Sequence, residues 1–212
     1  HPEFAFLPRK FKIAVNAAAT DRAVIRAHDI GLELLRDERG EIGLRVFVGG
    51  GLGRTPILGQ VIREFLPRQH LLSYLEAILR LYNRYGRRDN LYKARIKILL
   101  QALGIDEFRR QVEAEWAHLR DGPTTVPDEE FARLAAHFAP PAWETLPAVD
   151  TLHAARVADD LAFANWVRRC VHPHRTPGYA AVTLSLKAPG AAPGDISDTQ
   201  MLVVADLAER FS

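Results

Sequence analysis

The chain has 212 residues, and its 28 Lys and Arg against 26 Asp and Glu give a formal net charge of +2 at pH 7. Hydrophobic residues make up 48% of it, enough to bury a sizeable core in one large or two small domains. The balanced charge argues against a nucleic-acid partner, and no apolar run reaches the length of a membrane span. The single cysteine excludes an internal disulfide and a cluster held by four thiolates, and it favours a reducing, cytoplasmic location.

The first part of the chain reads as β-structure. Residues 7–18 predict a strand entered from a proline, and residues 29–36 and 42–49 alternate apolar side chains as half-buried strands do. The short polar connection that contains Gly40 predicts a hairpin between the second and third strands.

Helices are expected next along the chain. Thr55 before a proline is typical of an N-cap followed by the first helical turn, which predicts a short helix over residues 55–65. Apolar residues then recur at helical spacing in residues 71–85, 90–103 and 106–119.

Prolines punctuate the middle of the chain. We interpret residues 121–150 as a linker that contains a short helix over residues 128–138. Beyond it, the pattern predicts strands over residues 164–171 and 179–186 and a helix over residues 197–210.

Together these elements predict an α+β protein. We expect a mixed sheet packed with helices over residues 1–120, the linker over residues 121–150 and an incomplete ferredoxin-like β-β-α module over residues 151–212. Such a module leaves a sheet edge unpaired, so the sequence reads as truncated, and this edge could serve a homodimer.

The first candidate site is Arg9-Lys10-Phe11-Lys12. On a strand, Lys10 and Lys12 point to one face and the other two residues to the opposite face. Two ammonium groups on one face repel unless an anion lies between them, so this pair could bind a small oxyanion and donate protons to it. The alternative is a solvated basic edge strand that discourages aggregation, and these four residues alone favour it.

The second candidate site is a glycine turn. Its members are Gly49, Gly50, Gly51, Leu52, Gly53 and Arg54. Such a turn permits close backbone approach to a ligand and leads toward the expected helix, whose N-terminus favours anions. It is neither a P-loop nor a dinucleotide fingerprint, because the Lys-Ser/Thr of the first and the third glycine of the second are missing. A simple strand-to-helix turn stays open as the alternative.

Two weaker candidates follow. Arg88 and Arg95 lie seven residues apart, so on one helix they would share a face on which a polyanion could rest, although a solvated basic face is the usual meaning of such a run. Cys170, His172 and His174 alternate as metal ligands on a strand can, but a proline interrupts them and no fourth ligand is obvious. A buried thiol beside surface histidines is the better interpretation.

Four segments, taken in order, resemble the sulfite and nitrite reductase haemoproteins. They are HPEFAFLPRKFKIAV, VGGGLGRTP, NRYGRRDNLYKARIKILLQALG and NWVRRCVHPHRTPGYAAVTLSLKAPG. The LPRKFK element and the glycine turn are the specific part, and the last segment is similar to the opening of the second ferredoxin-like half-module of proteobacterial members. The resemblance covers most of the chain and leans toward the haemoprotein beta-component of assimilatory sulfite reductase.

This resemblance implies an enzyme that couples a sirohaem to a 4Fe-4S cluster. Such enzymes reduce sulfite to sulfide, or nitrite to ammonia, with six electrons supplied by a ferredoxin or a flavoprotein subunit. Sirohaem carries eight carboxylates, so its pocket is rich in Arg and Lys.

The resemblance also implies roles for individual residues. Arg9 would contact a sirohaem carboxylate, and the catalytic Lys10 and Lys12 would bind the oxyanion and help to supply protons. Arg95 occupies a substrate-facing position where many relatives have lysine, and arginine keeps the charge but does not deprotonate. The cofactor-binding positions would be Gly49, Gly50, Gly51, Leu52, Gly53, Arg54, Arg88 and Asn90.

The chain departs from the family pattern at both ends. The family's first ferredoxin-like half precedes LPRKFK, its four cluster cysteines come later, and Cys170 lies in the wrong motif to be one of them. We therefore expect no metal site here, no cofactor bound to this chain alone and no turnover without the rest of the protein. A basic anion- or RNA-binding module and a purely structural domain stay open as alternatives, although the aromatic residues near the basic segments form no stacking motif.

Overall fold

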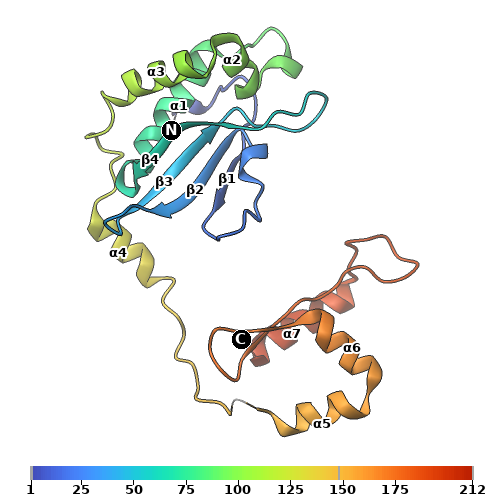
Figure 1. The fold of residues 1–212 in the computed structure, drawn as a ribbon. Helices are drawn as coiled ribbons and strands as arrows, with labels where there is room; N and C mark the ends of the chain where they lie inside the picture. Colours follow the sequence, from blue (N-terminus) through green and yellow to red (C-terminus); the bar gives the residue numbers. More distant parts are fainter. Residues whose placement is uncertain (1, 148, 212) are drawn as a thin grey trace. The chain divides into compact units, whose positions relative to one another are not determined.

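A four-stranded mixed sheet organises the first part of the chain (Figure 1). Its strands are β1 (Ile13–Asn16), β2 (Ile30–Arg36), β3 (Ile42–Val48) and β4 (Gln60–Pro67), in the spatial order β1-β2-β3-β4. β1 pairs parallel with β2, whereas β2–β3 and β3–β4 are antiparallel, so the mixed sheet and the β2–β3 hairpin are confirmed.

Three helices pack on this sheet and complete its core. They are α1 (Leu71–Tyr85), α2 (Ile96–Leu103) and α3 (Ile105–Trp116). Their apolar side chains form one buried cluster with those of β2, β3 and β4, and its largest fully buried members include Tyr74, Tyr82 and Phe108. The remaining short elements of this part are the 3-10 helices η1 (Pro2–Phe4), η2 (Ile25–Ala27), η3 (Arg68–His70) and η4 (Leu91–Lys93).

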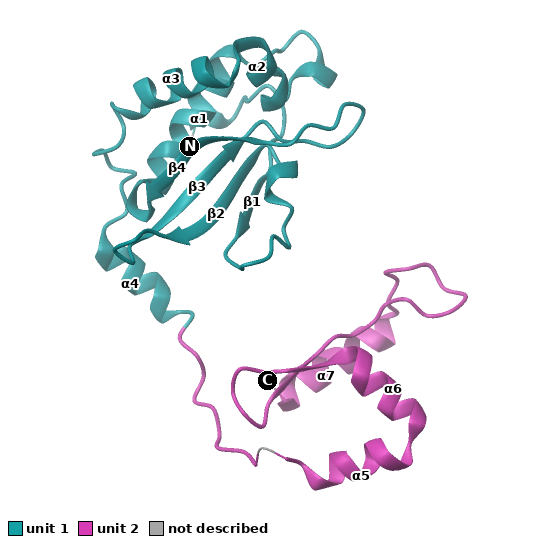
Figure 2. Ribbon diagram, viewed as in Figure 1, with its two compact units in different colours: residues 1–138 teal, residues 139–212 magenta. Residues whose placement is uncertain are grey.

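This computed structural model describes residues 2–147 and 149–211 and divides the chain into two units, 1–138 and 139–212 (Figure 2). The division falls inside the proline-rich segment predicted as a linker. The helix predicted in that segment is α4 (Asp128–Ala136), and it belongs to the first unit.

The second unit is small and contains both helices and strands. It consists of α5 (Thr151–Asp159), α6 (Leu161–Cys170), β5 (Val171–Pro173), β6 (Ala180–Val182) and α7 (Asp198–Phe211). A β-β-α order is present, because β5 and β6 form an antiparallel hairpin that α7 follows, but its first strand begins only at Val171, the last residue of the segment predicted as that strand. With the mixed sheet and helices of the first unit, this confirms the α+β class. Among the helices of the described residues, none combines the length and apolarity that crossing a bilayer requires.

The helix predicted over residues 55–65 is wrong. Residues 60–67 form β4 instead, which pairs with β3 through a register irregularity and places Ile62 and Leu66 in the core. Pairing with an adjacent strand satisfies the backbone groups of this segment, and this tertiary contact overrides the local capping signal at Thr55.

The strand predicted over residues 164–171 is also wrong. Those residues lie largely in α6, which begins after Asp160; the Asp160 side chain caps the helix by accepting a hydrogen bond from the Phe163 N–H at 2.9 Å. Asp150 caps α5 in the same way, and α5 had not been predicted. Aspartate preceding a helical stretch is a strong N-cap signal, so both starts were visible in the sequence.

Two further expectations need correction. The strand predicted over residues 7–18 is shorter in the structure, where only β1 (Ile13–Asn16) is extended as a strand. Lys10 and Lys12 therefore precede the strand. The helix predicted over residues 90–103 is split into η4 and α2, because the Asn90 side chain caps η4 and Arg95 is the extended residue before α2.

Candidate anion and cofactor site

A cavity of about 460 Å³ lies in the first unit between the glycine turn and the segment that leads into α2. Five cationic side chains line it: Arg9, Arg54, Lys93, Arg95 and Lys97. Leu52, Gly53, Thr55, Tyr92 and Ile98 complete the lining, so none of the described residues around the cavity is acidic. A concave site lined by one sign of charge attracts ligands of the opposite sign.

The glycine turn requires glycine at its start. Gly49 has φ +81°, and a Cβ there would lie 2.4 Å from Leu100 Cδ2. At Gly50 a Cβ would lie 2.2 Å from the Arg26 carbonyl oxygen, closer than any side chain permits. The turn is then closed by two backbone hydrogen bonds of 2.9 Å between Gly51 and Ile57.

Lys97 holds this turn against α2. The residue is only 8% exposed, and its Nζ donates to the backbone carbonyls of Thr55 at 2.5 Å and Leu52 at 3.5 Å. A buried ammonium group needs such partners, because an unpaired one would be strongly destabilising. Lys97 was not predicted as a site residue; the only signal was a lysine within an apolar helical stretch.

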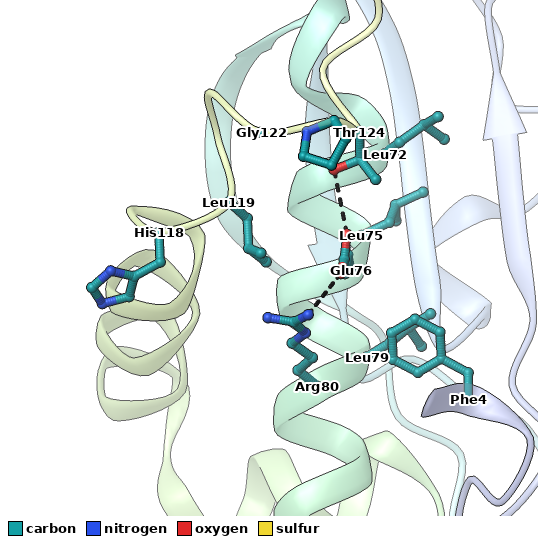
Figure 3. Close-up of a pocket in the computed structure, with 11 residues that line it drawn as sticks. Phe4, Leu72, Leu75, Glu76, Leu79, Arg80, His118, Leu119, Gly122 and Thr124 are labelled. Atoms are coloured by element: carbon teal, nitrogen blue, oxygen red, sulfur yellow. Dashed lines mark hydrogen bonds and ion pairs between the residues drawn. The ribbon is translucent and has the colours of Figure 1, made fainter. Parts of the chain in front are cut away.

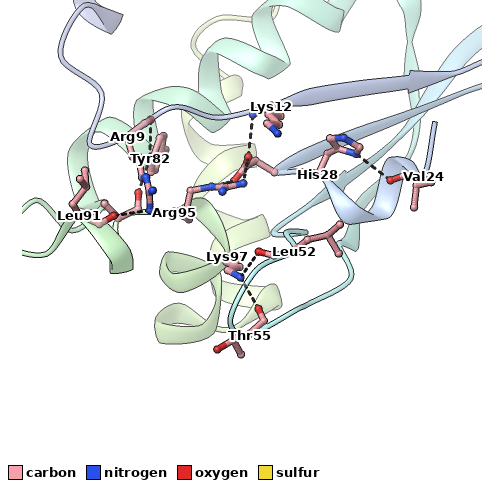
Figure 4. A network of polar contacts seen from close by, with 12 residues as sticks. Arg9, Lys12, Val24, His28, Leu52, Thr55, Tyr82, Leu91, Arg95 and Lys97 are labelled. Atoms are coloured by element: carbon pink, nitrogen blue, oxygen red, sulfur yellow. Dashed lines mark hydrogen bonds and ion pairs between the residues drawn. The ribbon is translucent and has the colours of Figure 1, made fainter. Parts of the chain in front are cut away.

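Arg95 forms a bidentate ion pair at the back of the cavity. Its Nε and Nη2 lie 2.7 and 2.5 Å from the two carboxylate oxygens of Asp29, which is fully buried. The hydrogen bonds that Arg95 donates to the Asp29 carboxylate raise the pKa of Arg95. The Lys12 N–H donates to the same carboxylate at 2.9 Å, and Figure 4 shows the polar network to which Arg95 and Lys12 belong.

Arg9 connects the N-terminal segment to the other wall. Its Nη1 donates to the Leu91 carbonyl at 2.9 Å, and its own carbonyl lies 3.0 Å from the Tyr82 hydroxyl. That hydroxyl also lies 2.6 Å from the Ala94 carbonyl, so buried Tyr82 joins the segment of Arg9 to the segment that leads into α2.

The structure brings together most, but not all, of the predicted site residues. Arg9, Leu52, Gly53, Arg54 and Arg95 line the cavity, and Gly49, Gly50 and Gly51 form the start of the turn beside it. Lys10 and Lys12 are exposed and do not line the cavity itself, although Lys12 is adjacent to the Asp29–Arg95 pair.

Arg88 and Asn90 make local contacts outside the cavity. An Arg88 guanidinium nitrogen donates to the carbonyl and side-chain oxygens of Asn83, both at 2.7 Å, and Asn90 caps η4. The expectation that Arg88 and Arg95 share a helix face is wrong, because no single helix contains both residues.

A second cavity of about 480 Å³ lies in the first unit over α1, but its lining is mainly apolar (Figure 3). The one arginine in it, Arg80, forms ion pairs with Glu3, Glu76 and Glu115. Its charge is therefore already matched, and this cavity offers less to an anion than the cationic one.

The histidines near Cys170 are occupied by other contacts. The His172 ring lies 3.2 Å from the Thr183 hydroxyl, and His174 Nδ1 accepts the Thr176 N–H at 3.0 Å. Within residues 2–147 and 149–211, no group of three His, Cys, Asp or Glu side chains could hold a metal ion.

Comparison with known proteins identifies the family of this chain. Residues 1–119 match the family described as the nitrite and sulphite reductase 4Fe-4S domain. More than half of the chain is matched, and the chain therefore belongs to the nitrite and sulphite reductase family.

Several relatives in this family are sulfite reductases. The chain is 35% identical over 129 residues to sulfite reductase (ferredoxin) 1 of Mycolicibacterium paratuberculosis, covering 60% of this chain and 23% of that protein. It is 34% identical over 116 residues to the sulfite reductase (NADPH) hemoprotein beta-component of Methylobacterium radiotolerans, covering 51% of this chain and 19% of that protein. The chain thus spans about a fifth of the length of these relatives.

A solved structure is also similar to this chain. The NirA protein of Mycobacterium tuberculosis matches with a TM-score of 0.51 and 32% identity, over 57% of this chain and 22% of that protein.

Proposed function

We propose that this chain supplies the anion- and sirohaem-facing part of an assimilatory sulfite reductase, which reduces sulfite to sulfide with six electrons. One observation carries the proposal: five cationic side chains surround a cavity beside a turn that only glycine can form. The same site would serve nitrite reduction to ammonia, the alternative reaction of the family.

The cationic lining of the cavity suits carboxylate groups, of which sirohaem carries eight. Arg9, Arg54 and Lys93 come from three different segments, so they can match several anionic groups at once. Glycines in the adjoining turn allow close backbone approach. When bound, the sirohaem supplies the iron at which the anion accepts electrons.

Lys10 and Lys12 are proposed to attract the oxyanion and donate protons to it. Reduction of sulfite to sulfide with loss of three oxygens as water consumes protons, and exposed ammonium groups can supply them. Both lysines are exposed, and in the described part of the chain neither forms an ion pair with a carboxylate. Asp29 fixes the backbone at Lys12, which orients this segment.

The 4Fe-4S cluster does not fit this chain. Residues 1–119 contain no cysteine, and Cys170 is the only one in the sequence, whereas such a cluster needs four thiolates. We assign the cluster, and the contact with a ferredoxin or flavoprotein electron donor, to the rest of the full-length protein. A cytoplasmic location and a homodimer through an exposed sheet edge remain predictions.

The test uses the full-length reductase that contains this chain, loaded with both cofactors. Lys10→Ala and Lys12→Ala, singly and together, should lower sulfite turnover, by about a hundredfold or more in the double variant, because proton donation and anion binding are both lost. Turnover with sulfite and with nitrite is measured side by side, which identifies the preferred anion.

Lys187→Ala provides the control, since it removes an exposed lysine of the second unit. Turnover of the double variant at the level of this control would contradict the proposed roles of Lys10 and Lys12.

A further inference from the structure

A buried carboxylate behind the cationic cavity contacts three separate segments. Asp29 precedes β2 and is 0% exposed. Its side chain accepts the Lys12 N–H, and its backbone carbonyl accepts the Gly49 N–H, both at 2.9 Å. Arg95 donates two further hydrogen bonds to the carboxylate of Asp29. One residue therefore fixes the lysine segment, the glycine turn and the residue that precedes α2.

The contact with Arg95 also determines the charge at this wall. The two parallel N–H···O bonds are the geometry that a guanidinium makes with a carboxylate and that a lysine cannot reproduce. The Arg95 side chain is only 18% exposed, so solvent screens the pair weakly. Arg95 and Asp29 together contribute a net charge of zero next to the cavity.

We propose that Asp29 is a positioning residue that sets the charge of the anion site. This inference rests on the proposed function. It holds Arg95 as a neutral, rigid pair, so that Arg95 shapes the wall while the lysines attract the anion. A purely structural carboxylate would hold the same segments together, but its charge would not influence anion affinity. The two roles predict different results when the carboxylate becomes an amide: tighter anion binding if Asp29 sets the charge, and unchanged or weaker binding if its role is only structural.

The experiment uses the full-length, cofactor-loaded reductase, and sulfite affinity is measured by titrating the absorption spectrum of the sirohaem at several salt concentrations. Asp29→Asn leaves Arg95 with an uncompensated charge, so sulfite should bind about three- to tenfold more tightly at low ionic strength, and salt should weaken this binding more steeply. Arg95→Gln leaves the carboxylate unpaired and should weaken binding by a similar factor.

The double variant Asp29→Asn/Arg95→Gln is decisive, because it restores a neutral hydrogen-bonded pair. Affinity and salt dependence should return to those of the wild type. Glu33→Gln is the matched control: it removes one negative charge from β2 in a half-exposed ion pair with Arg45 and should change neither quantity. Thermal unfolding of every variant establishes that each one folds.

Two outcomes would overturn the inference. The first is a folded Asp29→Asn enzyme whose sulfite affinity equals that of the Glu33→Gln control or is lower. Asp29 would then have only a structural role. A double variant as weak as Arg95→Gln would show that Arg95 contacts the anion directly. A wild-type enzyme whose spectrum does not respond to sulfite would instead refute the proposed function.

Discussion

At the scale of single residues, a few buried polar groups hold the walls of the cavity together. The Tyr82 hydroxyl shares its proton between the Ala94 and Arg9 carbonyls, and the Asp29 carboxylate joins Lys12 to Arg95. Each contact bridges segments far apart in sequence. The basic residues could therefore be recognised from the sequence, but the carboxylate and hydroxyl that position them could not.

Tyr82 allows a test of this arrangement through pH. Burial raises the pKa of Tyr82 above the usual value near 10. Below that value both the folded and the unfolded chain keep the proton, and the stabilising contribution of the hydroxyl is complete. Above it the unfolded chain loses the proton first, so the free energy of unfolding falls as pH rises toward the pKa of the folded protein.

We therefore expect Tyr82→Phe to lower the free energy of unfolding by about 1–2 kcal/mol at pH 8 and to reduce its decline above pH 10. Urea unfolding of the 212-residue chain between pH 8 and pH 11 measures both effects. Tyr92→Phe is the control, because Tyr92 is 84% exposed. Equal behaviour of the two variants would show that the buried hydroxyl contributes nothing.

At the scale of helices and strands, the sequence pattern predicts an element correctly where nearby residues determine where that element begins and ends. The helix expected over residues 71–85 is α1 as observed, because its apolar residues recur at helical spacing and Gly86 ends it. β4 was missed because its structure comes from pairing with β3, which no local pattern encodes. The same limit applies to the site: the glycine turn was recognised from its composition, but the contact of Lys97 with it depends on how α2 packs.

Replacing Lys97 should affect the stability of the glycine turn differently from the stability of the whole fold. Lys97→Met keeps the length of the buried chain but removes both hydrogen bonds to the turn, so the amides of Gly51 and Ile57 should exchange with solvent about tenfold faster. Global stability should stay equal or rise, because burying an ammonium group is costly. Hydrogen exchange and urea unfolding measure the two quantities.

Lys93→Met is the matched control, since it removes an exposed lysine from the same cavity without touching the turn. Unchanged exchange in Lys97→Met, or equally fast exchange in both variants, would contradict this role of Lys97.

At the scale of the whole molecule, the two units differ in how much they bury. The first unit has a continuous core that includes Ile30, Val46, Ile78 and Phe108, all of them 0% exposed. In the described residues of 139–211, no side chain is buried to that degree, although apolar residues are frequent on α7 and before it. Burial of apolar surface is the main source of stability, so we expect the units to differ strongly in stability.

Hydrogen exchange of the 212-residue chain, resolved by peptide, tests this difference. Amides of β3 and α1 should open with free energies of about 5 kcal/mol or more, whereas those of α5, α6 and α7 should open within about 1 kcal/mol of zero. The first unit serves as the internal reference, because both units experience the same conditions. Increasing urea should remove the protection of β3 and α1 in one cooperative step without a matching step in α7. Protection in α7 as strong as in α1 would mean that the second unit is stabilised by more than the contacts its own residues make.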